Sequence, residues 1–275
     1  MTVAKTIKKW YDKLGFPQEY DVLVDNALAE YKINAELTID KYDISEKDGK
    51  RNLLSFLFFC EKLQKKYKDM DIDEEILYDT LSDVVYWTVT WSKIKKELYL
   101  GELNWLKDHF KMNLFKLGRL QFCMSTARQD VPEKFLVKGD PIIDIHIPSV
   151  GPLYNEDCIK SINTAKKFFE KYFPEYKYKA FVCHSWLLDP GLKKMLHDDT
   201  NIIKFQNLFH IVGTDTSDMI LKFIFGWDVD RTNVDRCVCT SKFSHAIMEK
   251  AICGEALYQG YGVLDDRLFE ERPYA

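Results

Sequence analysis

The stretch GDPIIDIHIPSVGPLYNEDCIKSINTAKKFFEKYFPEYKYKAFVCHSWLLDP, residues 139–190, decides the fold of the second half of this chain. Within residues 142–147 isoleucines alternate with Asp144 and His146. A period of two is typical of a strand that buries one face and presents polar groups on the other. We therefore expect a strand here, with Asp144 and His146 on the same face.

A helix and a second strand follow. Residues 148–152 hold two prolines, which interrupt the backbone hydrogen bonds of a strand. Residues 156–172 carry apolar side chains at spacings of three and four, the pattern of a helix that packs on a sheet. Residues 180–188 are a second apolar strand, and Asp189 followed by Pro190 is typical of another helix start. We expect parallel strands joined by a right-handed crossover, with the ligand site at their carboxyl ends.

Length and composition exclude several classes of protein. With 275 residues the chain can form two domains without disulfides or metals. A net charge of −4 lacks the basic excess that binding a nucleic acid requires. Seven scattered cysteines indicate reduced thiols, and the longest apolar run, residues 53–60, is too short to cross a membrane. With no apolar leader, we expect a soluble, cytoplasmic protein without nucleic-acid or membrane partners.

The first part of the chain has the apolar spacing of helices. We expect helices over residues 2–14, 17–31, 51–67, 74–98 and 105–117, with Gly101 ending the fourth. The spacing then changes to alternation at Gly118, so we predict a helical domain over residues 1–116 and a sheet domain over residues 117–275. The predicted fold class is α+β.

The rest of the second domain is assigned from shorter patterns. We expect strands at residues 119–124, 135–138 and 202–212, the first two joined by a turn containing Pro132, and a closing helix over residues 240–258. Residues 218–227 are apolar enough for either a buried strand or a helix.

The loop at residues 149–153 lies between a strand end and a helix start. Backbone N–H groups at such a place can bind an anion, for example a pyrophosphate. Pro152 has no N–H, and Glu156 with Asp157 already places negative charge at the helix start, so a plain turn is the alternative.

Three titratable side chains are predicted to meet near one edge of the sheet, namely Asp144, His146 and His184. A neutral histidine is the usual proton acceptor in group transfer. The alternative is that each is a buried polar residue satisfied by a neighbour, for example Asp144 by Arg119. Cys183 cannot form a nucleophile and base pair with His184, because consecutive strand residues face opposite ways.

Four potential metal ligands occur near the end of the chain, at Cys237, Cys239, His245 and Cys253. Their spacing matches no common zinc pattern, so we interpret the cysteines as ordinary thiols and expect no metal.

Five runs of sequence resemble those of one protein family. They are YDTLSDVVYW (78–87), NWLKDHFKMNLFKLGRLQF (104–122), DIHIPSVGPL (144–153), FVCHSWLLDPGLKKML (181–196) and NIIKFQNLF (201–209). In this order they resemble bacterial acyltransferase-like proteins with a helical N-acyltransferase N-terminal domain and a GNAT-like C-terminal domain.

The resemblance implies an acyl-CoA-dependent N-acyltransferase that acylates a small amine or similar nucleophile. Acyl-CoA or acetyl-CoA would be the co-substrate. By the resemblance, residues 142–147 and 180–188 are the two strands that splay apart around the pantetheine arm. The amides of Val150, Gly151 and Leu153 would hold the pyrophosphate, and His146 would be the base, with Asp144 beside it and His184 in reserve.

The chain departs from the family pattern in two places. Typical loops of this kind carry two small residues after a Gln or Arg, whereas Gly151 is followed by Pro152. No tyrosine occurs in residues 189–197, where many such enzymes keep a general acid. Two alternatives to an acyltransferase therefore remain, a binding module that has lost catalysis and a cysteine-dependent hydrolase built on Cys183.

Overall fold

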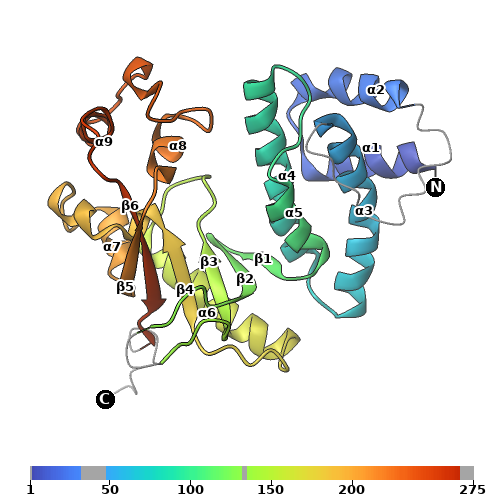
Figure 1. Ribbon diagram of the computed structural model, residues 1–275. Coiled ribbons are helices and arrows are strands. Elements are labelled where there is room, and N and C mark those ends of the chain that lie inside the picture. The colour runs from blue at the N-terminus through green and yellow to red at the C-terminus, as the bar shows by residue number, and fades with distance from the viewer. Residues whose placement is uncertain (1, 32–47, 132–134, 267–275) are drawn as a thin grey trace. The chain divides into compact units, whose positions relative to one another are not determined.

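The computed structural model describes residues 2–31, 48–131 and 135–266 (Figure 1). The chain divides into two compact units, Met1–Phe115 and Lys116–Ala275. Helices build the first unit, and a mixed sheet with helices builds the second, which confirms the predicted α+β class. The helices of the first unit are α1 (Val3–Leu14), η1 (Gln18–Tyr20), α2 (Asp21–Glu30), α3 (Gly49–Asp69), α4 (Glu74–Lys95) and α5 (Leu103–Phe110).

Local signals set the ends of these helices. The Thr2 hydroxyl accepts a hydrogen bond from the Lys5 amide and starts α1, and Gly15, at φ 66°, ends it. Asp73 caps α4 in the same way. α4 stops at Lys95, because Lys96 is left-handed at φ 59°, so the predicted end at residues 98–101 was too late.

The second unit contains a six-stranded sheet in the order β1-β2-β3-β4-β6-β5. The strands are β1 (Leu114–Leu117), β2 (Leu120–Thr126), β3 (Pro141–His146), β4 (Phe181–Ser185), β5 (Phe209–Thr216) and β6 (Tyr258–Leu264). β3 and β4 are parallel and are joined through α6 (Asn155–Tyr172), which confirms the predicted strand, helix and strand. β2 with β3, β4 with β6, and β5 with β6 are antiparallel, so the last strand of the chain lies inside the sheet (Figure 1).

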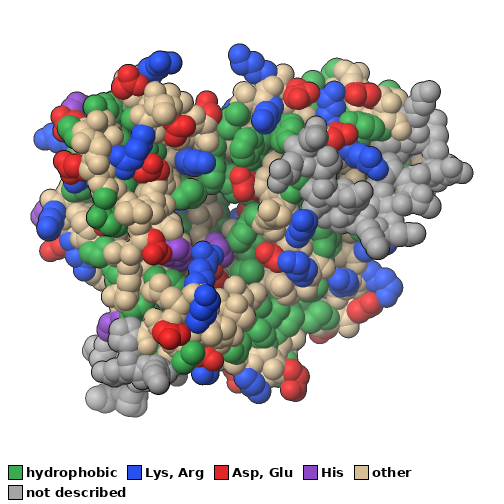
Figure 2. All heavy atoms as spheres, viewed as in Figure 1, with side chains coloured by type: hydrophobic (Ala, Val, Ile, Leu, Met, Phe, Trp, Pro, Cys, Tyr) green, Lys and Arg blue, Asp and Glu red, His purple; other side chains and the backbone are tan. Residues whose placement is uncertain are grey.

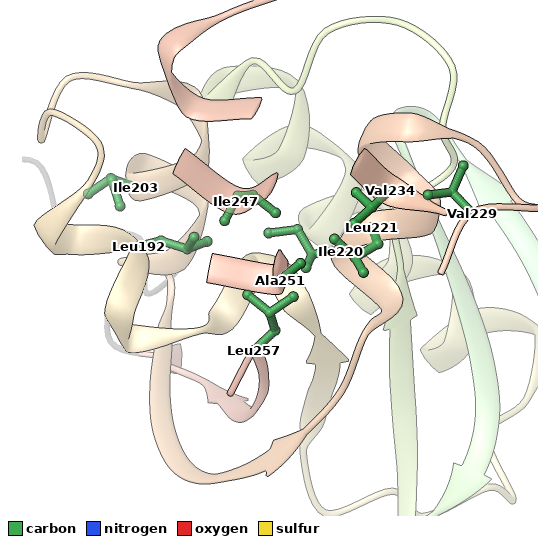
Figure 3. Close-up of a cluster of buried hydrophobic side chains, with 9 residues drawn as sticks. All are labelled: Leu192, Ile203, Ile220, Leu221, Val229, Val234, Ile247, Ala251 and Leu257. Carbon is green, nitrogen blue, oxygen red and sulfur yellow. The ribbon is translucent and has the colours of Figure 1, made fainter. Parts of the chain in front are cut away.

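The remaining helices of the second unit follow β4 in the sequence. They are η3 (Trp186–Leu188), η4 (Pro190–Lys194), α7 (Asn201–Gln206), α8 (Met219–Phe225), η5 (Val234–Arg236) and α9 (Lys242–Ile252). Figure 3 shows a buried apolar cluster to which all of them except η3 contribute. The cluster consists of Leu192, Ile203, Ile220, Leu221, Val229, Val234, Ile247, Ala251 and Leu257.

Four assignments from sequence were wrong. The helix predicted over residues 105–117 ends at Phe110, and its last residues form β1. Residues 135–138 form no strand, and the predicted turn at Pro132 lies outside the described residues. The strand predicted at residues 202–212 is α7 followed by β5, and the closing helix of residues 240–258 is α9, a turn and the start of β6.

Local capping explains two of these differences. The Thr200 hydroxyl accepts a hydrogen bond from the Ile203 amide, so the apolar run that follows starts as a helix. Gly254, left-handed at φ 73°, follows Cys253 at the end of α9, so the predicted closing helix stops before residue 258. The ambiguous residues 218–227 contain a helix, α8.

Among the described residues, no helix is long and apolar enough to span a membrane.

Candidate functional site

The two parallel strands at the centre of the sheet separate toward their carboxyl ends. The ladder between β3 and β4 ends at Asp144 paired with Val182. β3 nevertheless continues to His146, and β4 continues to Ser185. The separation agrees with the splay that the family resemblance implies, and it leaves polar residues at the point where the strands part.

Asp144 and His146 lie on one face of β3, as the alternating pattern predicted. Cys123 and Gln121 of β2 are their register partners. The Asp144 carboxylate is buried, and its Oδ2 atom lies 3.5 Å from Nε2 of His146. The His146 side chain keeps 31% of its surface exposed. The pair therefore combines a buried carboxylate with an accessible imidazole.

His184 on β4 has both ring nitrogens engaged. Nη1 of Arg128 lies 3.2 Å from Nδ1, and Oδ2 of Asp215 on β5 lies 3.2 Å from Nε2. The Tyr261 ring of β6 meets the imidazole edge to face, at 5.9 Å between centroids. Burial and then the charge of Arg128 lower the pKa of His184, although Asp215 and Asp144 act in the opposite direction.

Arg128 connects His184 to the first pair. Its Nη2 atom lies 3.7 Å from Oδ2 of Asp144. The structure thus brings together all three predicted residues, Asp144 with His146 directly and His184 through Arg128. Figure 2 shows histidine side chains of the second unit beside Lys or Arg side chains on the face drawn there.

The pairing of Asp144 with Arg119, which was the example of the structural alternative, does not form. Arg119 instead donates to three carbonyl oxygens of the loop between β3 and α6, those of Pro148, Gly151 and Pro152, at 3.0, 3.2 and 2.8 Å. Its guanidinium is partly buried by these contacts. Arg119 lies in the turn that follows β1, so it contacts the loop rather than the face of the sheet that carries Asp144.

The loop keeps backbone donors available. Within the described residues, the N–H groups of Val150, Gly151 and Leu153 donate no hydrogen bond. Gly151 has φ 72°, and a Cβ atom built there would meet nothing within 4 Å, so the backbone is open to approach. α6 begins directly afterwards without a side-chain cap.

The donors and the helix start suit an anionic group such as a pyrophosphate, because N–H groups at a helix N-terminus attract negative charge. Two features reduce that attraction. Pro152 supplies no N–H, and Glu156 with Asp157 places acidic side chains in the first turn of α6. The residues present therefore fit the group through the backbone of Val150, Gly151 and Leu153.

Cys183 has the properties of a core residue. Its side chain is fully buried, and burial followed by the negative charge of Asp144 raises the pKa of the thiol well above its ordinary value. A thiolate is the nucleophilic form of cysteine, and this environment opposes it.

Two residues of the site were missed from sequence. Arg128 follows the strand that alternation predicted, in a segment with no periodic signal, and Asp215 lies in β5, whose position was assigned wrongly. Among the described residues, no group of three or more His, Cys, Asp or Glu side chains could hold a metal ion.

Two family models together cover nearly the whole chain. The model of the GNAT-like C-terminal domain matches residues 114–264, more than half of the sequence. The chain belongs to this family. The model of the N-acyltransferase N-terminal domain matches residues 3–112, so the two-part architecture inferred from the sequence runs is confirmed.

Several solved structures share the fold of this family member. An acyltransferase in complex with decanoyl-CoA and teicoplanin superposes with a TM-score of 0.74 at 19% identity, over 94% of this chain and 87% of that chain. An acyltransferase with decanoyl-CoA alone gives 0.73 at 22% identity, over 94% and 86%. A third, with CoA and 10C-teicoplanin, gives 0.70 at 19% identity, over 96% and 85%. Among curated proteins, none matches this sequence significantly.

Proposed function

We propose that this protein is an acyltransferase that moves an acyl group from acyl-CoA to a small amine or similar nucleophile. The observation that carries the proposal is the point where β3 and β4 separate, which places the Asp144 and His146 pair just before a loop with free backbone donors. Family membership supports it, as do the acyl-CoA complexes of proteins with this fold. We further propose that residues 117–275 form the acyltransferase domain and residues 1–116 a helical domain.

The loop would bind the pyrophosphate of CoA through the N–H groups of Val150, Gly151 and Leu153. The dipole of α6, whose first N–H groups have no side-chain cap, adds to this attraction. Arg119 fixes the loop from its other side by occupying the carbonyl oxygens. The loop is therefore held in shape by its carbonyls while its amides stay available.

Acyl-CoA would supply an activated acyl group as a thioester. In the transfer, a C–N bond to the acceptor forms, the C–S bond breaks, and the sulfur leaves with the electron pair and takes up a proton. Nε2 of His146 faces the Asp144 carboxylate and carries the hydrogen, so Nδ1 is the nitrogen that accepts the proton that the attacking amine loses. The buried Asp144 carboxylate, 3.5 Å away, stabilises the positive charge that this creates. His184, the reserve candidate from sequence, has both ring nitrogens engaged, by Arg128 and Asp215, so His146 is the base we propose.

A binding module without catalysis is the second candidate. Pro152 and the acidic first turn of α6 favour it, because both weaken an anion site that catalysis would need. The cysteine-dependent hydrolase has no comparable support, since burial and the neighbouring Asp144 disfavour the Cys183 thiolate.

A thermal-shift titration with acyl-CoA of several chain lengths tests the binding step. A ligand at a hundred times its dissociation constant stabilises the folded protein by about 2.7 kcal/mol. Gly151→Val should remove most of this stabilisation, because a branched side chain strains the positive φ and crowds the loop backbone. Gly254→Val is the matched control, since Gly254 has φ 73° and equally open surroundings, away from the loop. Equal stabilisation of both variants by acyl-CoA would exclude this loop as the site.

A further inference from the structure

Arg128 occupies a fixed position although its side chain is 59% exposed. Its neighbour Ala127 is buried and exchanges backbone hydrogen bonds with Gly139 and Asp140, at 2.9 and 2.8 Å. The same segment packs on the sheet face that carries Asp144, through a cluster formed by Ala127, Val131, Leu136, Ile142, Ala180, Val182, Tyr261 and Val263. The backbone next to Arg128 is therefore fixed on this sheet face, and the guanidinium contacts Asp144 of β3 and His184 of β4.

The contact of Arg128 with His184 determines which ring nitrogen of the histidine carries the proton. A guanidinium only donates hydrogen bonds, so Nδ1 of His184, 3.2 Å from Nη1, has to be the acceptor. Nε2 then carries the hydrogen and donates to Oδ2 of Asp215 at 3.2 Å. A second proton on Nδ1 would place an N–H group against the Arg128 donor.

We propose that Arg128 is a positioning residue that holds His184 as the neutral Nε2–H tautomer, so that His146 alone accepts the substrate proton. Neither nitrogen of His184 can take a proton from a substrate while both contacts persist. The statement about His146 rests on the proposed acyltransferase function, whereas the statement about the tautomer does not.

The surroundings of His184 favour opposite protonation states. Burial and then the charge of Arg128 oppose the imidazolium, whereas Asp215 on β5 and Asp144 on β3 favour it. Tyr261 on β6 contacts the ring with its edge, and burial raises the pKa of its hydroxyl, so the ring faces a neutral phenol. His146 is a further titratable group on this sheet face, and it contacts Asp144. Without Arg128, two carboxylates would act on His184 with no opposing cation among these groups.

Histidine-selective ¹⁵N NMR over a pH series tests the assignment without any ligand. In the wild type, His184 should show the Nε2–H tautomer at pH 7. In Arg128→Met the titration midpoint of His184 should rise by about one pH unit, because a charge within hydrogen-bond distance is removed. Arg128→Lys should restore most of the wild-type midpoint, and Arg236→Met, an exposed arginine of the same unit, should leave it unchanged.

An unaltered tautomer and midpoint in Arg128→Met would overturn the proposal whether or not the protein is an enzyme. If the midpoint shifts while the wild type transfers no acyl group, the role of Arg128 stands and the proposed function fails. If transfer does occur, His184→Gln should retain turnover within about tenfold, whereas His146→Gln should lose a hundredfold or more. The reverse order would overturn the assignment of the proton to His146.

Discussion

Replacement of Ser161 by alanine tests how α6 is attached to the start of the sheet. The Ser161 hydroxyl donates to the Leu117 carbonyl, and it accepts from the Leu120 amide at 3.1 Å. All three residues are at most 2% exposed, so water does not readily replace the lost partner. Ser161→Ala therefore removes the hydrogen-bond partner of two buried backbone groups, the Leu120 N–H and the Leu117 C=O.

Each unsatisfied buried group costs about 1–3 kcal/mol. Leu117 and Leu120 flank the two-residue turn that follows β1. Part of the lost free energy is recovered if the Leu120 N–H and the Leu117 C=O bond to each other across this turn. We expect Ser161→Ala to lower the free energy of unfolding of the second unit by about 1–3 kcal/mol in total, measured by urea denaturation. Thr164→Ala on the same helix is the control, since its exposed hydroxyl bonds only to Lys160 of α6. Equal stability of the two variants would refute the reasoning.

Two further predictions concern the strands that flank the site. Gly260→Ala should lower the free energy of unfolding by at least about 2 kcal/mol, because the new Cβ would lie 2.2 Å from the Leu188 carbonyl oxygen. Gly213→Ala is the control, since its Cβ would meet only the movable end of the Gln129 side chain. Equal losses of the two variants in urea denaturation would contradict this prediction. The free energy of unfolding should also fall as the pH drops below about 6.5, because the pKa of His184 is lowered in the folded protein and protonation therefore favours the unfolded chain. His184→Gln should reduce this fall, and an identical pH profile of the variant would contradict the prediction.

Strand β3 could be predicted from sequence because its alternation and its tertiary surroundings agree. Ile143 and Ile145 are buried, and Asp144 and His146 share the opposite face, as a period of two requires. The same rule failed at residues 202–212. There the apolar density is equally high, but the hydroxyl of Thr200 starts a helix, and the strand begins only at Phe209.

The contacts that complete the candidate site could not be predicted from local sequence patterns. Arg128 and His184 are 56 residues apart, and His184 and Asp215 are 31 apart, so their contacts depend on the order of strands in the sheet. That order places β6 between β4 and β5, which the misassigned closing helix could not indicate. Likewise, the contacts of Arg119 with the loop carbonyls depend on the turn between β1 and β2, and the sequence pattern predicted β1 as the end of a helix.

Amine-dependent release of CoA is the measurement that tests the central claim most directly. The wild type, His146→Ala and His210→Ala, an exposed histidine on β5, would be mixed with saturating acyl-CoA and a panel of primary amines, and the freed thiol followed over time. We expect release by the wild type and His210→Ala above the enzyme-free rate. His146→Ala should bind acyl-CoA normally and release CoA about a hundred to ten thousand times more slowly. Binding without amine-dependent release by the wild type, or an unimpaired His146→Ala variant, would contradict the account.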